Sequence, residues 1–304
     1  MNSTKRFKNK KFIISSVLIL VIILFVLLNN FFAVIKDDGT YNISKIKYDN
    51  AEELNIDMYS NNYLLLDLNK LEVLYCKDID EIIYPASLTK VMTMLTVLNK
   101  VKDLNDISNI NQEERKELID LNASLAYLNV DQDYTIEDLL YALILPSGAD
   151  ASKALEKYFE NRNMNLLKEM KKIQRSLRLE NTSFMNTNGL HNDNHYTTIK
   201  DLLKITLKVL NFKKGREILK SESHILSDGL SVISTIPKNI TDDSRIKVLG
   251  GKTGYTPEAG LCLILLYEYD NNQYLWISSN AQGEYQSVLH LIDAYNMFNE
   301  VHLK

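Results

Sequence analysis

Pro85-Ala86-Ser87-Leu88-Thr89-Lys90-Val91-Met92-Thr93, extended by Met-Leu-Thr-Val-Leu to position 98, is the stretch that decides the fold. Apolar residues after Lys90 occupy nearly every side of a helix, which is typical of a helix in the middle of a domain. Ser87 and Lys90 are three residues apart near its start, so their side chains lie on one face. The stretch predicts a buried central helix that brings a hydroxyl group beside an amine.

Strand-like segments stand before and after this helix in the sequence. Residues 63–68 and 71–76, joined by the polar pair Asn69-Lys70, predict a hairpin. Residues 261–266 are continuously apolar, as in a strand buried on both faces. Strands are expected at 246–253, 261–269 and 274–278, and helices at 136–145, 148–159, 166–179, 198–209 and 288–298. This order predicts one α+β domain whose first and last strands share a sheet.

A serine hydroxyl needs a base beside it to become a useful nucleophile. Lys90 serves as that base when it is neutral, and burial together with a nearby cation lowers the pKa of a lysine. The apolar helix supplies the burial, and Lys252 is the candidate cation. At a helix N-terminus, the main-chain N–H of Ser87 is also placed to hold an oxyanion.

Two further motifs follow in order, Ser-Gly-Ala at 147–149 and Lys-Thr-Gly at 252–254. The second lies on an expected strand. At a sheet edge such a strand pairs with an extended substrate, and Gly254 lets the substrate backbone approach closely. Lys252 and Thr253 would then hold a substrate carboxylate by charge and hydrogen bond.

Each motif also has an ordinary structural explanation. In that interpretation Ser87 is a helix cap and Lys90 a surface lysine, and Ser147 is a cap with Asp150 three residues on. Lys-Thr-Gly is then only a strand end. Ser-x-x-Lys recurs at 44–47 and 244–247, so the order and context of the three motifs carry the functional interpretation.

The N-terminus has the pattern of a membrane anchor. Residues 1–11 carry five basic residues and no acid, and 12–35 is largely apolar, about the ~20 residues that span a bilayer. The basic cluster before this run predicts an uncleaved helix with its N-terminus in the cytoplasm and the remainder outside the cell membrane. A linker at 36–60 and a catalytic domain at 61–304 are expected to follow.

Charge and composition exclude several other classes of protein. The net charge is −4, and the basic tail leaves −9 on the remainder, which argues against a nucleic-acid partner. Cys76 and Cys262 lie in apolar, strand-like runs, so we expect two buried thiols rather than a disulfide or metal ligands. His191 and His195 lie in a polar loop with no Glu between them, which disfavours a metallopeptidase.

Together the motifs resemble those of the serine-type D-alanyl-D-alanine carboxypeptidases, the low-molecular-weight penicillin-binding proteins of peptidase family S11. The resemblance runs from about Tyr63 to about Val301. Beyond the nucleophile stretch it includes 134–147, 184–190 followed by His195-Tyr196-Thr197-Thr198, and 251–260. It implies a DD-peptidase/β-lactamase-like domain, an antiparallel sheet of about five strands flanked by helices, with a helical lobe.

The resemblance also implies an activity, the removal of the terminal D-alanine from peptidoglycan stem peptides. Ser87 would form an acyl-enzyme, Lys90 would take its proton, and Ser147 would help pass that proton to the leaving amine. Stem peptides ending in D-Ala-D-Ala would be the substrates and β-lactams the inhibitors. No metal or other cofactor is implied.

The same resemblance assigns the substrate-binding residues. Lys252 and Thr253 would bind the terminal carboxylate, and Gly254 would belong to the strand that the substrate follows. The main-chain N–H groups of Ser87 and Tyr255 would form the oxyanion hole.

The chain departs from the family pattern at Ala149, where relatives usually have an Asn that orients the lysine and contacts the substrate amide. Many relatives also carry an additional β-rich domain and a C-terminal anchor, and Lys238 aligns only loosely with their basic substrate-binding residue.

A catalytically weak domain that binds muropeptides or β-lactams is therefore an alternative function, as is a DD-transpeptidase. A class A-type β-lactamase is disfavoured because 150–230 contains no Glu-x-x-x-Asn.

Overall fold

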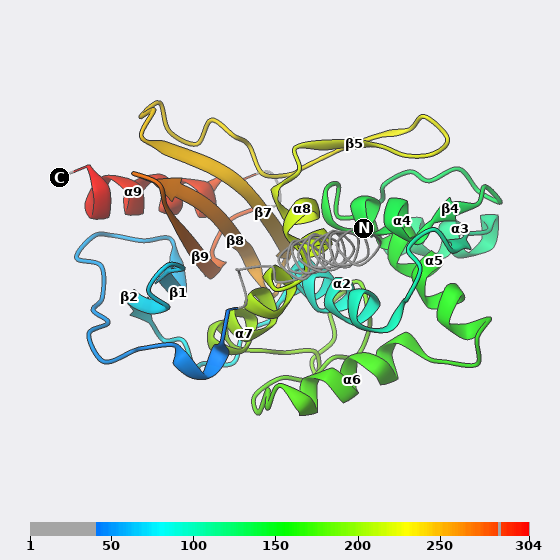
Figure 1. Cartoon of the computed structure of the whole chain (residues 1–304), viewed down its shortest axis with the longest axis horizontal. Coiled ribbons are helices and arrows are strands. Elements are labelled where there is room, and N and C mark those ends of the chain that lie inside the picture. The colour runs from blue at the N-terminus through cyan, green and yellow to red at the C-terminus, as the bar shows by residue number, and fades with distance from the viewer. Residues whose placement is uncertain (1–40, 285–286, 304) are drawn as a thin grey trace, which may run out of the picture. The chain divides into compact units, whose positions relative to one another are not determined.

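A five-stranded antiparallel sheet in the order β2-β1-β9-β8-β7 organises the structure (Figure 1). This computed structural model describes residues 41–284 and 287–303. The strands are β1 (Ser60–Asp67), β2 (Glu72–Lys77), β7 (Ile246–Thr256), β8 (Gly260–Tyr269) and β9 (Asn272–Ala281). The N-terminal hairpin pairs with the last strand, with Leu64 opposite Ile277. The expected pairing of first and last strands is therefore confirmed.

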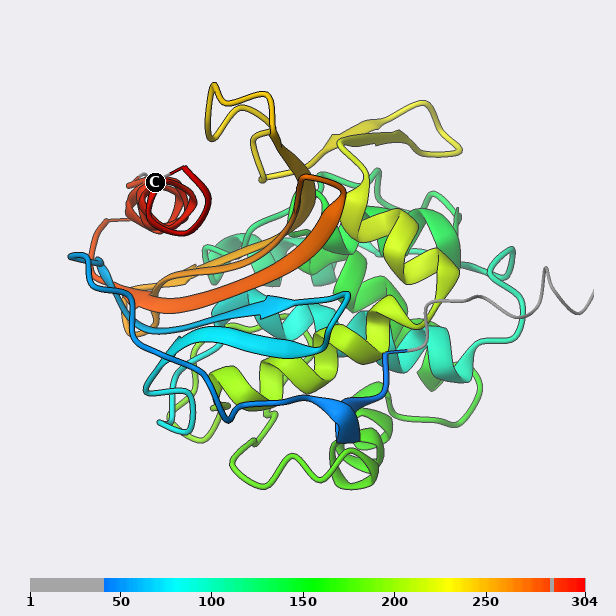
Figure 2. The same cartoon turned by 60° about the vertical axis from the view of Figure 1, so that its left-hand side comes forward.

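Side chains of the sheet alternate between two separate cores. Leu64 on β1 and Ile264 on β8 face the larger core, which they share with most of the helices. Leu65 and Leu263 face the other side and pack with α9 (Leu289–His302). Figure 2 shows α9 by itself on one face of the sheet and the remaining helices on the other. Residues 261–266 are at most 2% exposed, so the expected strand buried on both faces is confirmed.

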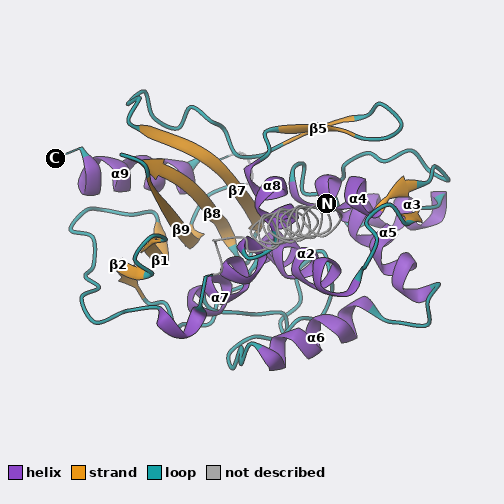
Figure 3. Cartoon of the chain, viewed as in Figure 1, coloured by secondary structure: helices purple, strands orange, loops and turns teal. Residues whose placement is uncertain are grey.

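The central helix is α2 (Thr89–Lys100), labelled in Figure 3. It is buried from Thr89 to Val97. It begins later than the sequence suggests, because a short 3-10 helix, η2 (Ala86–Leu88), precedes it. The helices around it are α3 (Gln112–Asp120), α4 (Ile136–Ile144), α5 (Ala149–Glu160), α6 (Leu166–Ser176), α7 (Ile199–Leu210) and α8 (Lys213–Lys220). The sequence pattern predicts all of these except α3 and α8, which are short and strongly polar.

Residues 41–59 pack on the domain, although they fall within the expected linker at 36–60. After the 3-10 helix η1 (Ile43–Lys45), this segment runs beside β2 through isolated bridges, and Lys47 N–H donates to Leu71 O at 2.9 Å. Cys76 N–H donates to Glu52 O at 2.8 Å. The outer edge of β2 is thus covered, and β7 ends the sheet on its other side.

Two small two-stranded sheets complete the fold, β3 (Ile107–Ser108) with β4 (Tyr134–Thr135) and β5 (Ser223–Ile225) with β6 (Ser231–Ile233). Their strands are too short to give an alternating pattern in the sequence, and they were not predicted.

The two cysteines lie on different strands of the main sheet. Cys76 is on β2 and Cys262 on β8, with β1 and β9 between them. Three strand spacings of roughly 4.8 Å separate them by about 14 Å, well beyond the reach of a disulfide. Both are free thiols, as expected, but only Cys262 is buried, whereas Cys76 is half-buried.

The predicted membrane anchor at 12–35 lies outside the described residues. Within 41–284 and 287–303, none of the helices combines the length and the apolar character needed to cross a bilayer.

Candidate active site

Ser87 lies where the central helix begins, on a backbone held from two sides. Ala86 before it has a φ of 45°, in the left-handed region that costs a non-glycine residue about 1 kcal/mol. Gly189 presses against this turn, since a Cβ built on it would lie 2.0 Å from Ala86 O. Gly254 on β7 faces the other side, where a Cβ would lie 3.2 Å from Ser87 N. The conformation at Ser87 is therefore fixed by a loop and a strand far apart in the sequence.

Lys90 is directly beside the hydroxyl. Its Nζ lies 2.9 Å from Ser87 Oγ and donates a hydrogen bond to Asn188 O at 2.6 Å. The lysine is only 2% exposed. Burial lowers the pKa of Lys90 to about 7, against a smaller opposing effect from the negative charge of Asp150. Near neutral pH much of this lysine is an amine with a free electron pair, as a base for Ser87 requires.

The rate of Ser87 acylation should follow this pKa. Only neutral Lys90 accepts the serine proton, so the second-order rate of acylation by a penicillin should rise about tenfold per pH unit below pH 7 and level off above it. Stopped-flow measurements between pH 5 and pH 9 would give the profile. A rate that is flat across pH 7, or that falls as the pH rises, would contradict the role of Lys90 as base.

Lys252 is a second buried lysine at the same site. It lies on β7 and is fully buried, and its Nζ donates to Thr253 O at 2.7 Å. Burial, followed by the charge of Lys90, holds the pKa of Lys252 well below its usual range. The charge of Lys90 thus disfavours protonation of Lys252. The reverse effect, which the sequence predicts, is not found, because burial is what lowers the pKa of Lys90.

The expected carboxylate-binding strand is at a sheet edge. β7 is the terminal strand of the five-stranded sheet. Thr253 on it lies with its Oγ1 2.7 Å from Oγ1 of Thr235, which comes from the segment after β6. Thr235 is an exposed hydroxyl that sequence reasoning did not identify, because no local pattern indicates which strand its segment will meet.

Gly254 has a further role besides the predicted one. The space that its side chain would occupy is bounded by Pro85 O, Ser87 N and Leu88 N at 3.2–3.3 Å. The absent Cβ thus lets β7 pack against the start of the central helix. Tyr255, the next residue, lies opposite Leu261 on β8, on the stretch of β7 that passes Ser87.

Ser147 lies in the helical lobe, in the turn between α4 and α5. It has a φ of 66° and is 6% exposed, and its Oγ has no hydrogen-bond partner among the described residues. The hydroxyl bonds neither Ser87 nor Lys90. It also does not cap α5, whose N-cap is Gly148 with no side-chain hydrogen bond. The capping explanation for Ser147 is therefore wrong, and a buried hydroxyl remains for another partner.

The alternative explanation for the first motif is wrong as well. No side chain caps η2 or α2, so Ser87 is not a helix cap. Lys90 is a buried residue rather than a surface lysine.

Asp150 shapes the turn that carries Ser147. Its carboxylate accepts hydrogen bonds from the N–H groups of Ala126 at 2.8 Å and Leu128 at 3.0 Å. It also accepts one from Ala151 N–H at 3.0 Å. A fully buried carboxylate with three main-chain donors is well satisfied, and it fixes the start of α5 against residues 126–128.

Ala149 offers no polar group to the site. It is 1% exposed, and its N–H donates to Ser124 O at 2.7 Å. Lys90 is instead held by the main-chain carbonyl of Asn188. The lysine is therefore positioned without the Asn that relatives usually have at this point. Asn188 lies in the 184–190 stretch quoted from the sequence, but a carbonyl contact has no side-chain signature.

Lys238 contacts two main-chain carbonyls in this structure. Its Nζ donates to Leu249 O and, at 3.4 Å, to Lys220 O. The side chain thus joins the start of β7 to the end of α8.

His195 is a structural residue beneath the nucleophile turn. Its Nε2 lies 2.8 Å from Thr89 Oγ1, and its Nδ1 accepts from Met185 N–H at 3.3 Å. This pattern assigns the proton to Nε2. Burial lowers the pKa of His195 to about 4, so the ring stays neutral at physiological pH. Within the described residues, no group of three or more His, Cys, Asp or Glu is placed to hold a metal ion.

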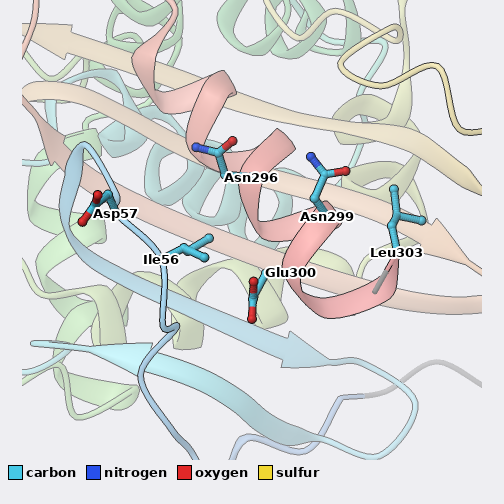
Figure 4. Close-up of a pocket in the computed structure, with 6 residues that line it drawn as sticks. All are labelled: Ile56, Asp57, Asn296, Asn299, Glu300 and Leu303. Atoms are coloured by element: carbon cyan, nitrogen blue, oxygen red, sulfur yellow. The ribbon is translucent and has the colours of Figure 1, made fainter.

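A separate hollow of about 480 Å³ lies between the lead-in to β1 and the last turns of α9 (Figure 4). Its lining contains amides, two carboxylates and apolar groups, but no nucleophile paired with a base. It is also on the face of the sheet that α9 covers, away from α2. The residues are Ile56, Asp57, Asn296, Asn299, Glu300 and Leu303. We therefore do not assign the chemistry to it.

Comparison with known proteins identifies the family to which the chain belongs. The D-alanyl-D-alanine carboxypeptidase model of peptidase family S11 matches residues 47–281. D-alanyl-D-alanine carboxypeptidase DacF of Bacillus subtilis (strain 168) is 28% identical over 205 residues, which is 66% of this chain and 52% of the relative. The chain spans about half the length of this and other curated relatives.

Solved structures share the fold. The DD-transpeptidase of Streptomyces K15 superposes with a TM-score of 0.66 at 25% identity, over 80% of this chain and 95% of that one. Penicillin-binding protein D2 of Listeria monocytogenes, in its ampicillin-bound form, superposes with a TM-score of 0.67 at 22% identity, over 81% of this chain and 98% of that one. The α+β domain with its five-stranded antiparallel sheet is thus of the DD-transpeptidase type. The family model covers most of the chain, including all three motifs, and the chain belongs to the D-alanyl-D-alanine carboxypeptidase family, peptidase family S11.

Proposed function

We propose that this protein is a membrane-anchored serine D-Ala-D-Ala carboxypeptidase that removes the terminal D-alanine from peptidoglycan stem peptides. The observation that carries the proposal is the contact of Ser87 Oγ with a buried Lys90 Nζ at 2.9 Å. Membership of the family supplies the substrate class. The apolar run at 12–35 supports an anchor in the cell membrane with the catalytic domain on the extracytoplasmic side.

The reaction begins with transfer of the Ser87 proton to neutral Lys90. Ser87 Oγ forms a bond to the carbonyl carbon of the penultimate D-alanine, and the oxygen of that carbonyl becomes an oxyanion. The main-chain N–H groups of Ser87 and Tyr255 stabilise the oxyanion in this proposal. Lys252, with Thr253 and Thr235, holds the terminal carboxylate at the edge of β7.

Collapse of the oxyanion breaks the peptide bond and releases D-alanine. Its amine takes a proton from Lys90, with Ser147 as the relay; the Ser147 hydroxyl is buried and has no partner among the described residues. Water then attacks the ester on Ser87 and frees both the shortened peptide and the serine. β-Lactams acylate Ser87 by the same first step, in keeping with the ampicillin-bound relative of the same fold.

Ala149 is the observation that favours the alternative, a domain that binds muropeptides or β-lactams and turns over little. The side chain that usually contacts the substrate amide is missing. The position of Lys90 does not depend on it, because Asn188 O holds the lysine. This contact favours the enzyme over the binding protein.

Release of D-alanine from a peptide ending in D-Ala-D-Ala tests the proposal. Residues 36–304 should release D-alanine, and Ser87→Ala should lower the rate by about 10⁴-fold or more. Ala149→Asn measures what the missing side chain contributes. A folded protein that is acylated by a penicillin but releases no D-alanine would establish the binding role instead. Release only when an amino acceptor is present would establish a transpeptidase.

A further inference from the structure

A groove of about 330 Å³ lies on the helical side of the domain, where α2, α6 and α7 end close together. Its apolar lining comes from Leu95, Ile173, Leu177 and Phe212. Lys208 and Asn211 add polar groups, and its lining residues include no acid. A volume of this size is in the range of small-molecule sites. The catalytic chemistry does not use this groove, since none of its lining residues belongs to the motifs around Ser87.

The chain enters the domain beside this groove. Asn211, which lines it, accepts a hydrogen bond from Tyr41 N–H at 2.6 Å and donates one to Tyr41 O at 3.0 Å. Only residues 36–40 separate Tyr41 from the apolar run that ends at Ile35. Five extended residues span at most about 18 Å. If 12–35 crosses the membrane, the groove is tethered within that distance of the lipid headgroups.

The segment of chain that contributes α6 and α7 to the groove is rich in basic residues, and Lys208 is a charged residue of the lining. The segment 166–220, which contains α6, α7 and α8, has twelve Lys or Arg and five Asp or Glu in a chain whose net charge is −4. Lys204 Nζ, in the middle of α7, donates to Arg178 O after α6 at 3.2 Å and pairs with Asp201 at 2.8 Å. Lys213 follows Phe212, and Lys100 follows Asn99 and pairs with Glu169 at 2.7 Å.

The helix ends themselves do not cancel this charge. Each helix C-terminus carries about half a negative charge. The last turns of α2, α6 and α7 contain Lys100, Arg175 and Lys208, each with a full positive charge. An apolar floor with a cationic rim complements an amphiphile that has an anionic head.

We propose that this groove binds an anionic phospholipid of the membrane that holds the chain, and that it thereby orients the catalytic domain on the membrane surface. The acyl or glycerol portion contacts the apolar floor, and the phosphate meets Lys208 and the neighbouring basic side chains. This inference rests on the proposed anchor at 12–35. The bound lipid would be a second attachment of the domain to the membrane, besides the five-residue tether. It would restrict the directions in which Ser87 can face.

The test uses the full chain reconstituted in liposomes, with Cys76→Ser to remove the half-buried thiol and Ser176→Cys in the groove to carry an environment-sensitive fluorophore. Flotation with the liposomes tests the anchor first. The change in fluorescence of the label should then be at least twofold larger in liposomes of phosphatidylcholine with one-third phosphatidylglycerol than in liposomes of phosphatidylcholine alone. Lys208→Glu should reduce the response to the level in phosphatidylcholine alone. Lys116→Glu, an exposed lysine on α3, is the matched control and should leave it unchanged.

Three results would overturn the inference. Equal responses in the two lipids would mean that the tether alone brings the groove near the membrane. Equal losses in Lys208→Glu and Lys116→Glu would mean a diffuse charge effect. Failure to float would remove the anchor on which the inference rests. Penicillin acylation of each variant in detergent should match that of the unchanged protein, so that a failure of the lipid site is distinguished from a failure of the catalytic proposal.

Discussion

Lys90→Met should reduce acylation of Ser87 by about 10³-fold while leaving the domain at least as stable as before. Methionine has a length similar to that of lysine and fills the same buried space, but it has no electron pair able to take the serine proton. A positioned general base contributes about 10²–10⁴-fold to a rate. The measurements are the second-order rate of acylation by a labelled penicillin and the midpoint of thermal unfolding.

The stability half of this prediction follows from burial. Burial holds the pKa of Lys90 near 7, below the 10.5 of an exposed lysine. The unfolded chain therefore binds more protons between those values, and the penalty for burying Lys90 is full below pH 7 and shrinks as the pH rises toward 10.5. Lys90→Met removes that penalty, so its advantage in unfolding midpoint should be largest below pH 7. Met also loses the hydrogen bond to Asn188 O, which offsets part of the gain.

Lys157→Met is the matched control, because Lys157 Nζ on α5 bonds only the Asn109 side chain, away from the motifs. It should keep the full rate of acylation. Rapid acylation of the Lys90→Met protein would show that another group takes the serine proton. A slow variant that also unfolds at much lower temperature would show that the lysine acts through the fold.

Gly189→Ala should damage both the fold and the nucleophile. Its φ of 84° adds about 1 kcal/mol of backbone strain, and its Cβ would lie 2.0 Å from Ala86 O, where backbone has to move. We expect a loss of roughly 3 kcal/mol and a fall in Tm of roughly 5–10 °C. A shift of about 1 Å at Ser87 would also slow acylation by about 10²-fold. Calorimetry and the penicillin assay measure the two effects.

Gly229→Ala isolates the contribution of the clash. Gly229 has nearly the same φ, 91°, but nothing lies within 4 Å of the place where its Cβ would be. This variant should show the backbone strain alone, a fall of about 2–4 °C in Tm, and unchanged acylation. Equal behaviour of the two variants would mean that the contact between Gly189 and Ala86 does not hold the turn that presents Ser87.

Much of the architecture could be predicted from the sequence because burial and periodicity are local. The continuous apolar run at 261–266 indicated a strand buried on both faces, and Leu263 and Ile264 do face different cores. The apolar character around Lys90 indicated that the lysine is buried. The segment 41–59 was misjudged because it contacts β2 through isolated main-chain bridges, which leave no alternation of side chains to recognise.

Only those parts of the candidate site whose side chains belong to sequence motifs could be predicted. The contact of Ser87 with Lys90 follows from a spacing of three residues, about one turn, where η2 continues into α2. The contacts of Lys90 with Asn188 O and of Thr253 with Thr235 depend on the tertiary path of two loops. Main-chain carbonyls and single threonines have no distinctive sequence pattern. The absence of an Asn at position 149 could be read from the sequence, but the carbonyl that holds the lysine in its place could not.

The position of the acyl group after reaction with a penicillin tests the central claim most directly. Residues 36–304 would be treated with the β-lactam, digested and examined by mass spectrometry. We predict one modified peptide, the one that contains Ser87, and no modified peptide in Ser87→Ala. An acyl group on Ser147 or any other residue, or a folded protein that forms no adduct, would contradict the assignment of Ser87 as the nucleophile.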